Sequence, residues 1–146
     1  MRKIVVVYSS KYGSTKQYAK WIAEEKGADL IQLNKAKIEI LLKYDIIVFG
    51  GGVYANQLKF KKFIIKNYNV LKDKKVIIFA VGSSPVTDEA IEKIKKANFN
   101  SLDFNNISFY LLRGAFDFNN LSPEDKLIMN IFMLKLKSME KLDCLW

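Results

Sequence analysis

Residues 9–15 hold the side chains of this sequence that are best suited to chemistry. The segment has four Ser or Thr hydroxyls and one glycine, it follows an apolar run, and it precedes a stretch with helical spacing. Hydroxyl donors and the free N–H groups of a helix start converge on an anion, and the helix dipole favours its negative charge. The segment therefore predicts a site for a phosphate monoester held by neutral donors.

Two common nucleotide-binding loops are absent from the chain. The pattern G-x-x-x-x-G-K-[ST], which holds nucleoside triphosphates, does not occur, and neither does the dinucleotide fingerprint G-x-G-x-x-G. The sequence thus disfavours triphosphate hydrolysis and shows no fingerprint for a nicotinamide cofactor.

The chain has no histidine and one cysteine, Cys144. The lack of histidine excludes histidine acid–base catalysis, Ser–His triads and histidine-ligated metals. A single cysteine forms no internal disulfide, so we expect a reducing compartment. We predict neither a catalytic side chain nor a metal site.

Apolar runs alternate with segments of helical spacing along all 146 residues. The predicted strands are residues 3–8, 28–33, 45–50, 75–81 and 107–112. The predicted helices are residues 15–26, 37–43, 58–71 and 87–97, and a last helix that opens at residues 122–125. This alternation predicts one α/β domain, residues 1–146, with a doubly wound parallel sheet.

Six of the seven glycines follow a predicted strand. They are Gly13, Gly50, Gly51, Gly52, Gly82 and Gly114. Ligands of open α/β sheets bind outside the carboxyl ends of the strands, where glycine permits close approach and positive φ. The run at residues 50–52 exceeds what turn geometry alone requires, so we predict a ligand site at this edge.

The run Val6-Val7-Tyr8-x-Ser10-x-x-Gly13-x-Thr15-x-x-x-Ala19 resembles the N-terminal signature of flavodoxins. The longer run VVYSSKYGSTKQYAKWIAEE resembles flavodoxin-domain proteins grouped with menaquinone-dependent protoporphyrinogen oxidase. The likeness covers the whole chain in element order and length, although its motif is specific only in the first twenty or so residues. It implies a flavodoxin-like five-stranded parallel sheet of order 2-1-3-4-5 with helices on both faces, and FMN as cofactor.

The resemblance also implies three groups of cofactor-binding residues. The phosphate loop would comprise Ser10, Lys11, Tyr12, Gly13, Ser14 and Thr15. The loop against the isoalloxazine ring would comprise Gly51, Gly52, Val53, Tyr54, Ala55 and Asn56, with Tyr54 stacking and a glycine peptide near N5. The loop on the other side of the ring would comprise Gly82, Ser83 and Ser84, and it lacks an aromatic residue, which leaves that face open.

The charge departs from the acidic balance usual in flavodoxins. The formal net charge is +9, to which residues 1–75 contribute +10 and residues 76–146 contribute −1. Seven lysines gather on and just after the predicted third helix: Lys59, Lys61, Lys62, Lys66, Lys72, Lys74 and Lys75. They predict either a solvated face or an anionic partner: an acidic redox protein, an anionic small molecule such as a porphyrinogen, or a membrane surface.

The function that these features favour is FMN-dependent electron transfer, with the chemistry supplied by the flavin. One alternative is a protoporphyrinogen oxidase-type FMN enzyme that passes electrons to a quinone. Others are a flavodoxin-like interaction module without FMN and a nicotinamide-dependent flavin or quinone reductase. We expect a cytoplasmic protein, with peripheral membrane contact as an alternative and no nucleic-acid partner, because no motif for reading bases occurs.

Overall fold

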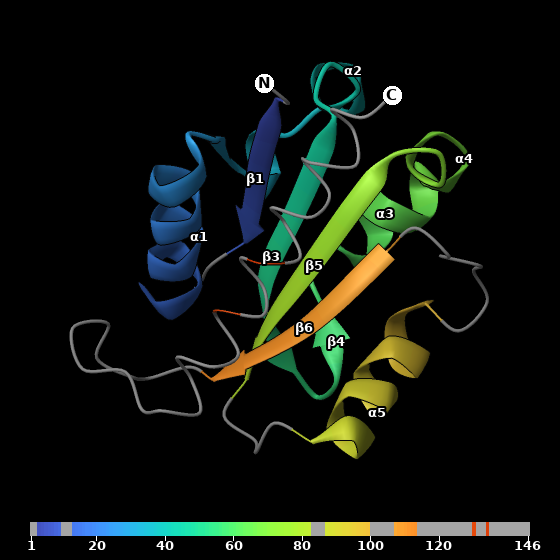
Figure 1. Cartoon of the computed structure of the whole chain (residues 1–146). Coiled ribbons are helices and arrows are strands. Elements are labelled where there is room, and N and C mark those ends of the chain that lie inside the picture. Colours follow the sequence, from blue (N-terminus) through green and yellow to red (C-terminus); the bar gives the residue numbers. More distant parts are fainter. Residues whose placement is uncertain are drawn as a thin grey trace.

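The computed structural model describes residues 3–9, 13–82, 87–99 and 107–113, together with residues 130 and 134. Its sheet has the order β2-β1-β3-β5-β6, and all neighbours on this path are parallel (Figure 1). These strands are β1 (Ile4–Ser9), β2 (Asp29–Gln32), β3 (Ile46–Tyr54), β5 (Lys75–Gly82) and β6 (Ile107–Arg113). The predicted fold class and the predicted order 2-1-3-4-5 of the parallel strands are confirmed. A short strand that was not predicted, β4 (Gln57–Leu58), pairs antiparallel with the end of β3.

The central strands form because their β-branched and aromatic runs are buried on both faces. Val5, Ile47 and Ile77 are fully buried, as expected for parallel strands covered on each side. Strand β2 lies at the edge of the sheet and is mostly exposed, with Leu30 at 36%.

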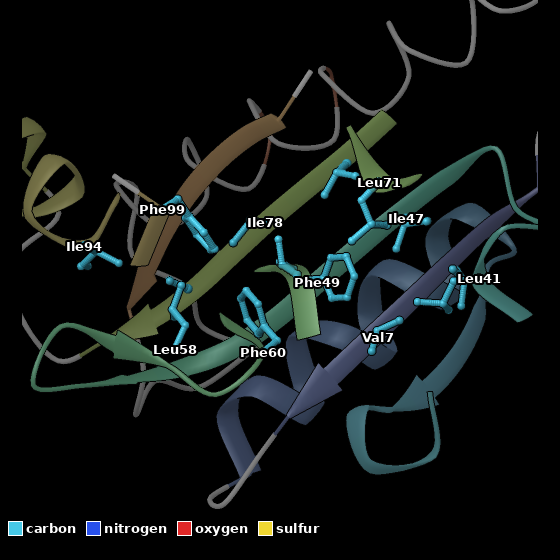
Figure 2. Close-up of a cluster of buried hydrophobic side chains, with 14 of the residues drawn as sticks. Val7, Leu41, Ile47, Phe49, Leu58, Phe60, Leu71, Ile78, Ile94 and Phe99 are labelled. Atoms are coloured by element: carbon cyan, nitrogen blue, oxygen red, sulfur yellow. The ribbon is translucent and has the colours of Figure 1, made fainter. Parts of the chain in front are cut away.

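Helices cover the two faces of the sheet unequally in the described part of the chain. Helix α1 (Gly13–Lys26) packs Tyr18, Ala19 and Ile22 against one face. The other face is covered by α2 (Ile38–Leu41), α3 (Lys61–Lys66), α4 (Tyr68–Leu71) and α5 (Asp88–Phe99). A 3₁₀ turn, η1 (Leu33–Lys35), follows β2. Figure 2 shows the core under this second face, where Leu41, Leu71, Ile94 and Phe99 surround Phe49 and Phe60.

Two predicted helix boundaries are confirmed by their caps. Gly27 ends α1 with φ +62°, and the N–H of Ala28 donates to the carbonyl of Ala23 at 2.9 Å. This is the pattern of a glycine stop in the left-handed region. At the start of α5 the N–H of Ala90 donates to Thr87 Oγ1 at 3.1 Å, so Thr87 caps this helix.

The helix predicted over residues 58–71 is wrong in its extent. The chain first forms β4, then α3, and it breaks at Asn67 before α4. Leu58, the first residue of the predicted helix, instead pairs with Val53 of β3, and the helical spacing of the apolar side chains after it does not reveal this pairing. The predicted helix from residue 122 falls largely outside the described residues.

Candidate functional site

The carboxyl edge of the sheet is uneven, because β3 runs further than its neighbours. Ser9 is the last residue of β1 and pairs with Gly51, whereas β3 continues for three residues to Tyr54. Strands β5 and β6 end together at Gly82 and Arg113. The end of β3 and the hairpin that follows it therefore project from the edge where the sequence predicts a ligand.

The start of α1 lies at this same edge, directly after β1. Gly13 is exposed, Ser14 is partly buried, and Thr15 is 4% exposed. The first turn of α1 contains no acidic residue that would offset the positive end of the helix dipole. Three residues of the predicted phosphate loop thus occupy a helix start that suits an anion. The other three, Ser10, Lys11 and Tyr12, lie outside the described residues.

The glycine run 50–52 has a packing role inside the sheet. It lies inside β3 rather than after it, and among the described glycines only Gly27 has positive φ. A Cβ on Gly50 would come within 2.0 Å of the Phe79 ring, and a Cβ on Gly51 within 2.9 Å of the Phe60 ring. The glycines therefore make room for aromatic rings that pack against both faces of the strand.

Positive φ occurs instead at Ala55 (50°) and Asn56 (63°). These two residues connect Tyr54 to Gln57, which pair across the β3–β4 hairpin. Two positive φ values in a two-residue hairpin loop define a type I′ turn, whose twist matches that of the strands. Alanine adopts this region at a cost of about 1–2 kcal/mol, so the hairpin is locally strained.

Tyr54 presents an accessible aromatic ring at the projecting edge. The side chain is 47% exposed, and its ring lies 3.3 Å from the position of a Cβ on Gly52. Because side chains alternate along a strand, Tyr54 and Gly52 share the face of Gly50, against which Phe79 and α1 pack. The ring therefore lies on the same side of the sheet as the start of α1.

Two hollows border this edge of the sheet. One, of about 550 Å³, lies between the hairpin, the end of β5 and the start of α5, and its lining includes Val53, Asn56, Gly82 and Thr87. The second, of about 480 Å³, lies beside the ends of β1 and β2 and is lined by Tyr8, Ser9, Gln32, Leu33, Asn34 and Lys59. Gly82 thus borders the first hollow, while Ser83 and Ser84 lie outside the described residues.

A buried residue that sequence analysis missed supports the hairpin. Asn98, near the end of α5, is 3% exposed and hydrogen-bonds to both Asn56 and Leu58. The only signal in the sequence is an amide four residues after Ile94, on a helix face that is otherwise apolar.

Two tyrosines have raised pKa values. The hydroxyl of Tyr44 donates to Asp29 Oδ2 at 2.6 Å, and this bond is the largest cause that raises the pKa of Tyr44. Burial raises the pKa of Tyr110, which pairs with Phe79 in the sheet. Both phenols stay protonated at neutral pH, so neither is suited to exchange protons there.

The family of the chain follows from comparison with known proteins. A family model described as a flavodoxin domain matches residues 5–143. The chain belongs to the flavodoxin family. A relative from Methanocaldococcus jannaschii, an uncharacterized protein, is 28% identical over 116 residues, which are 78% of this chain and 76% of the relative.

Solved structures agree with the flavodoxin fold. The Trp repressor binding protein of Bacillus subtilis is 19% identical, with a TM-score of 0.63 over 88% of this chain and 94% of that chain. The two-electron reduced flavodoxin of Megasphaera elsdenii is 17% identical, with a TM-score of 0.57 over 80% of this chain and 90% of that chain. At these identities the likeness concerns the fold.

Two other kinds of feature are absent from the described residues. No helix there is long and apolar enough to cross a membrane. No three His, Cys, Asp or Glu side chains in that part of the chain gather where they could hold a metal ion.

Proposed function

We propose that this flavodoxin-family protein binds FMN and transfers electrons through it. One observation carries the proposal. At the carboxyl edge, α1, which has no acidic residue in its first turn, starts on the same side of the sheet as the exposed ring of Tyr54. A dianionic phosphate suits the first feature, and a planar aromatic ring suits the second. When bound, FMN supplies reversible electron transfer through its ring system.

The protein's own residues would bind and orient the cofactor. The N–H groups at Gly13, Ser14 and Thr15, with the hydroxyls of residues 10–15, would hold the phosphate. Tyr54 would stack on one side of the ring. The loop that begins at Gly82 has no aromatic residue, so the other side would stay open to an electron donor or acceptor.

Titration with FMN and with riboflavin, which lacks the phosphate, tests this assignment. Two charge-assisted hydrogen bonds to the phosphate correspond to an affinity about 100-fold higher for FMN. Equal affinities would overturn the phosphate site. Absence of binding by either flavin would overturn the proposed function and favour an interaction module.

The protoporphyrinogen oxidase alternative has no support from the family model or from the relatives described above. It stays a prediction of the sequence resemblance. Porphyrinogen oxidation in a quinone-coupled assay of the FMN-loaded protein would be required to sustain it.

We propose further that the redox partner has an acidic surface. Two of the seven clustered lysines stabilise the fold through hydrogen bonds to backbone carbonyls. Lys61 Nζ donates to Ala97 O at 3.1 Å, and Lys74 Nζ donates to Leu42 O at 2.8 Å. Four others, Lys59, Lys62, Lys66 and Lys72, are exposed, and among the described residues none of them forms an ion pair. Of these four, Lys59 lines a hollow with Ser9 at the candidate edge, and exposed cations there favour an acidic protein or an anionic small molecule.

A further inference from the structure

The β3–β4 hairpin cannot be stable through its own contacts. Only two residue pairs join its strands, Val53 with Leu58 and Tyr54 with Gln57. Isolated two-stranded hairpins are marginal in water even when longer, and this turn also holds Ala55 in the left-handed region. The conformation must therefore be held from outside the hairpin.

The side-chain amide of Asn98 stabilises the hairpin through both its oxygen and its nitrogen. Its Oδ1 accepts the N–H of Leu58 at 2.9 Å, and its Nδ2 donates to the carbonyl of Asn56 at 2.7 Å. The same Nδ2 donates to Ile94 O at 2.7 Å, which anchors the amide to its own helix. Asn98 thus fixes the turn and the returning strand to α5 across 40 or more residues of sequence.

A second contact reinforces the same connection at the surface. Lys61 Nζ donates to Gln57 Oε1 at 3.1 Å and to Ala97 O at 3.1 Å, which is the carbonyl next to Asn98. The hairpin is therefore tied to the last turn of α5 through a buried amide and a lysine. Of these, the buried amide is the stronger determinant because it is shielded from water.

We propose that Asn98 is a positioning residue that sets the FMN affinity and reduction potential of this protein through the hairpin. This inference rests on the proposed function. Tyr54 is the last residue of β3 before the turn, so a shift of the turn moves its ring and the backbone amides beside it. Protein dipoles and ring contacts next to a flavin tune its electronics, so their displacement alters both quantities.

The substitution Asn98→Ala tests the proposal, and Asn67→Ala is its matched control. Asn67 Nδ2 also donates to a helix carbonyl four residues earlier, Phe63 O at 2.8 Å, but no hydrogen bond ties its side chain to the hairpin. We expect FMN affinity to fall about tenfold in N98A and the reduction potential to shift, with both unchanged in N67A. Amide exchange at Leu58 should accelerate about tenfold in N98A alone.

The outcomes separate this inference from the proposed function. Wild-type affinity and potential in folded N98A would overturn the positioning role. Failure of the wild-type protein to bind FMN would overturn the proposed function and the flavin part of this inference, while Leu58 exchange would still measure the hold on the hairpin. If N98A does not fold, Asn98→Asp replaces it, because the carboxylate keeps the acceptor for Leu58 and loses both donated bonds.

Discussion

At the scale of single residues, the glycines of β3 are determined by aromatic packing. Gly50 faces Phe79, and Gly51 faces Phe60, whose ring stacks on Phe49 with centroids 5.6 Å apart. Phe79 is fully buried and Phe60 nearly so, so a ring that moved to admit a Cβ would have to displace its own neighbours. A Cβ at either position would therefore force a ring to shift, whatever ligand the edge of the sheet binds.

Gly50→Ala should destabilise the fold strongly. The added methyl group overlaps three carbons of the Phe79 ring, and overpacking of this kind costs about 3 kcal/mol. Urea denaturation followed by circular dichroism measures the loss. Gly82→Ala is the control, because its Cβ would meet only ordinary contacts at 3.8 Å or more, and its stability should stay near wild type. Equal effects of the two substitutions would contradict this packing account.

At the scale of elements, the hairpin after β3 is the feature that distinguishes the candidate site. It replaces the first turn of a predicted helix, it carries the strained turn at Ala55 and Asn56, and it is held by α5. Helix α5 begins shortly after the second predicted flavin loop, so one element connects both sides of the candidate site.

Exchange of the turn residues should stabilise the hairpin. Asn-Gly is the preferred pair for a type I′ turn, so A55N/N56G should raise the free energy of unfolding by about 1 kcal/mol. Asn98 bonds to the backbone carbonyl of residue 56, and the double substitution leaves that acceptor in place. Thermal unfolding of the two proteins gives the comparison. A lower melting temperature in the double variant would show that the turn is not of type I′.

At the scale of the whole molecule, the two halves of the chain differ in net charge. Residues 1–75 carry +10, and Lys59, which follows β4, lines a hollow with Ser9 at the carboxyl edge. By contrast, α5 pairs its charges internally, as in Lys93 with Glu89 at 3.6 Å. An acidic partner would therefore be attracted to the α3 side of the edge.

Electron transfer with an acidic ferredoxin should depend on these lysines. In the FMN-loaded protein we expect K59Q/K62Q/K66Q to slow the bimolecular rate about tenfold at low ionic strength, with the difference lost near about 0.5 M salt. K20Q/K95Q/K96Q removes the same charge from exposed positions on α1 and α5 and should have a smaller effect. Stopped-flow absorbance measures both rates. Equal slowing would show that net charge, not this face, controls the encounter.

Much of the fold could be predicted because its causes are local. Continuous β-branched runs require burial on both faces, which requires a parallel sheet with helices on each side. The Gly27 stop and the Thr87 cap act within a few residues of themselves, so their patterns are visible in the chain. The hydroxyl-rich segment before α1 is equally local, and its described residues begin that helix as predicted.

The tertiary structure decided what depends on distant partners. The glycines at 50 and 51 are explained by rings from β5 and from the segment after β4, and a helix prediction over residues 58–71 cannot anticipate pairing with β3. Asn98 gains its role only where folding brings it against a turn 42 residues away. The physical reason is the same in each case: periodicity reports how one segment meets its surroundings, whereas steric exclusion and a buried hydrogen bond depend on which other segment lies there.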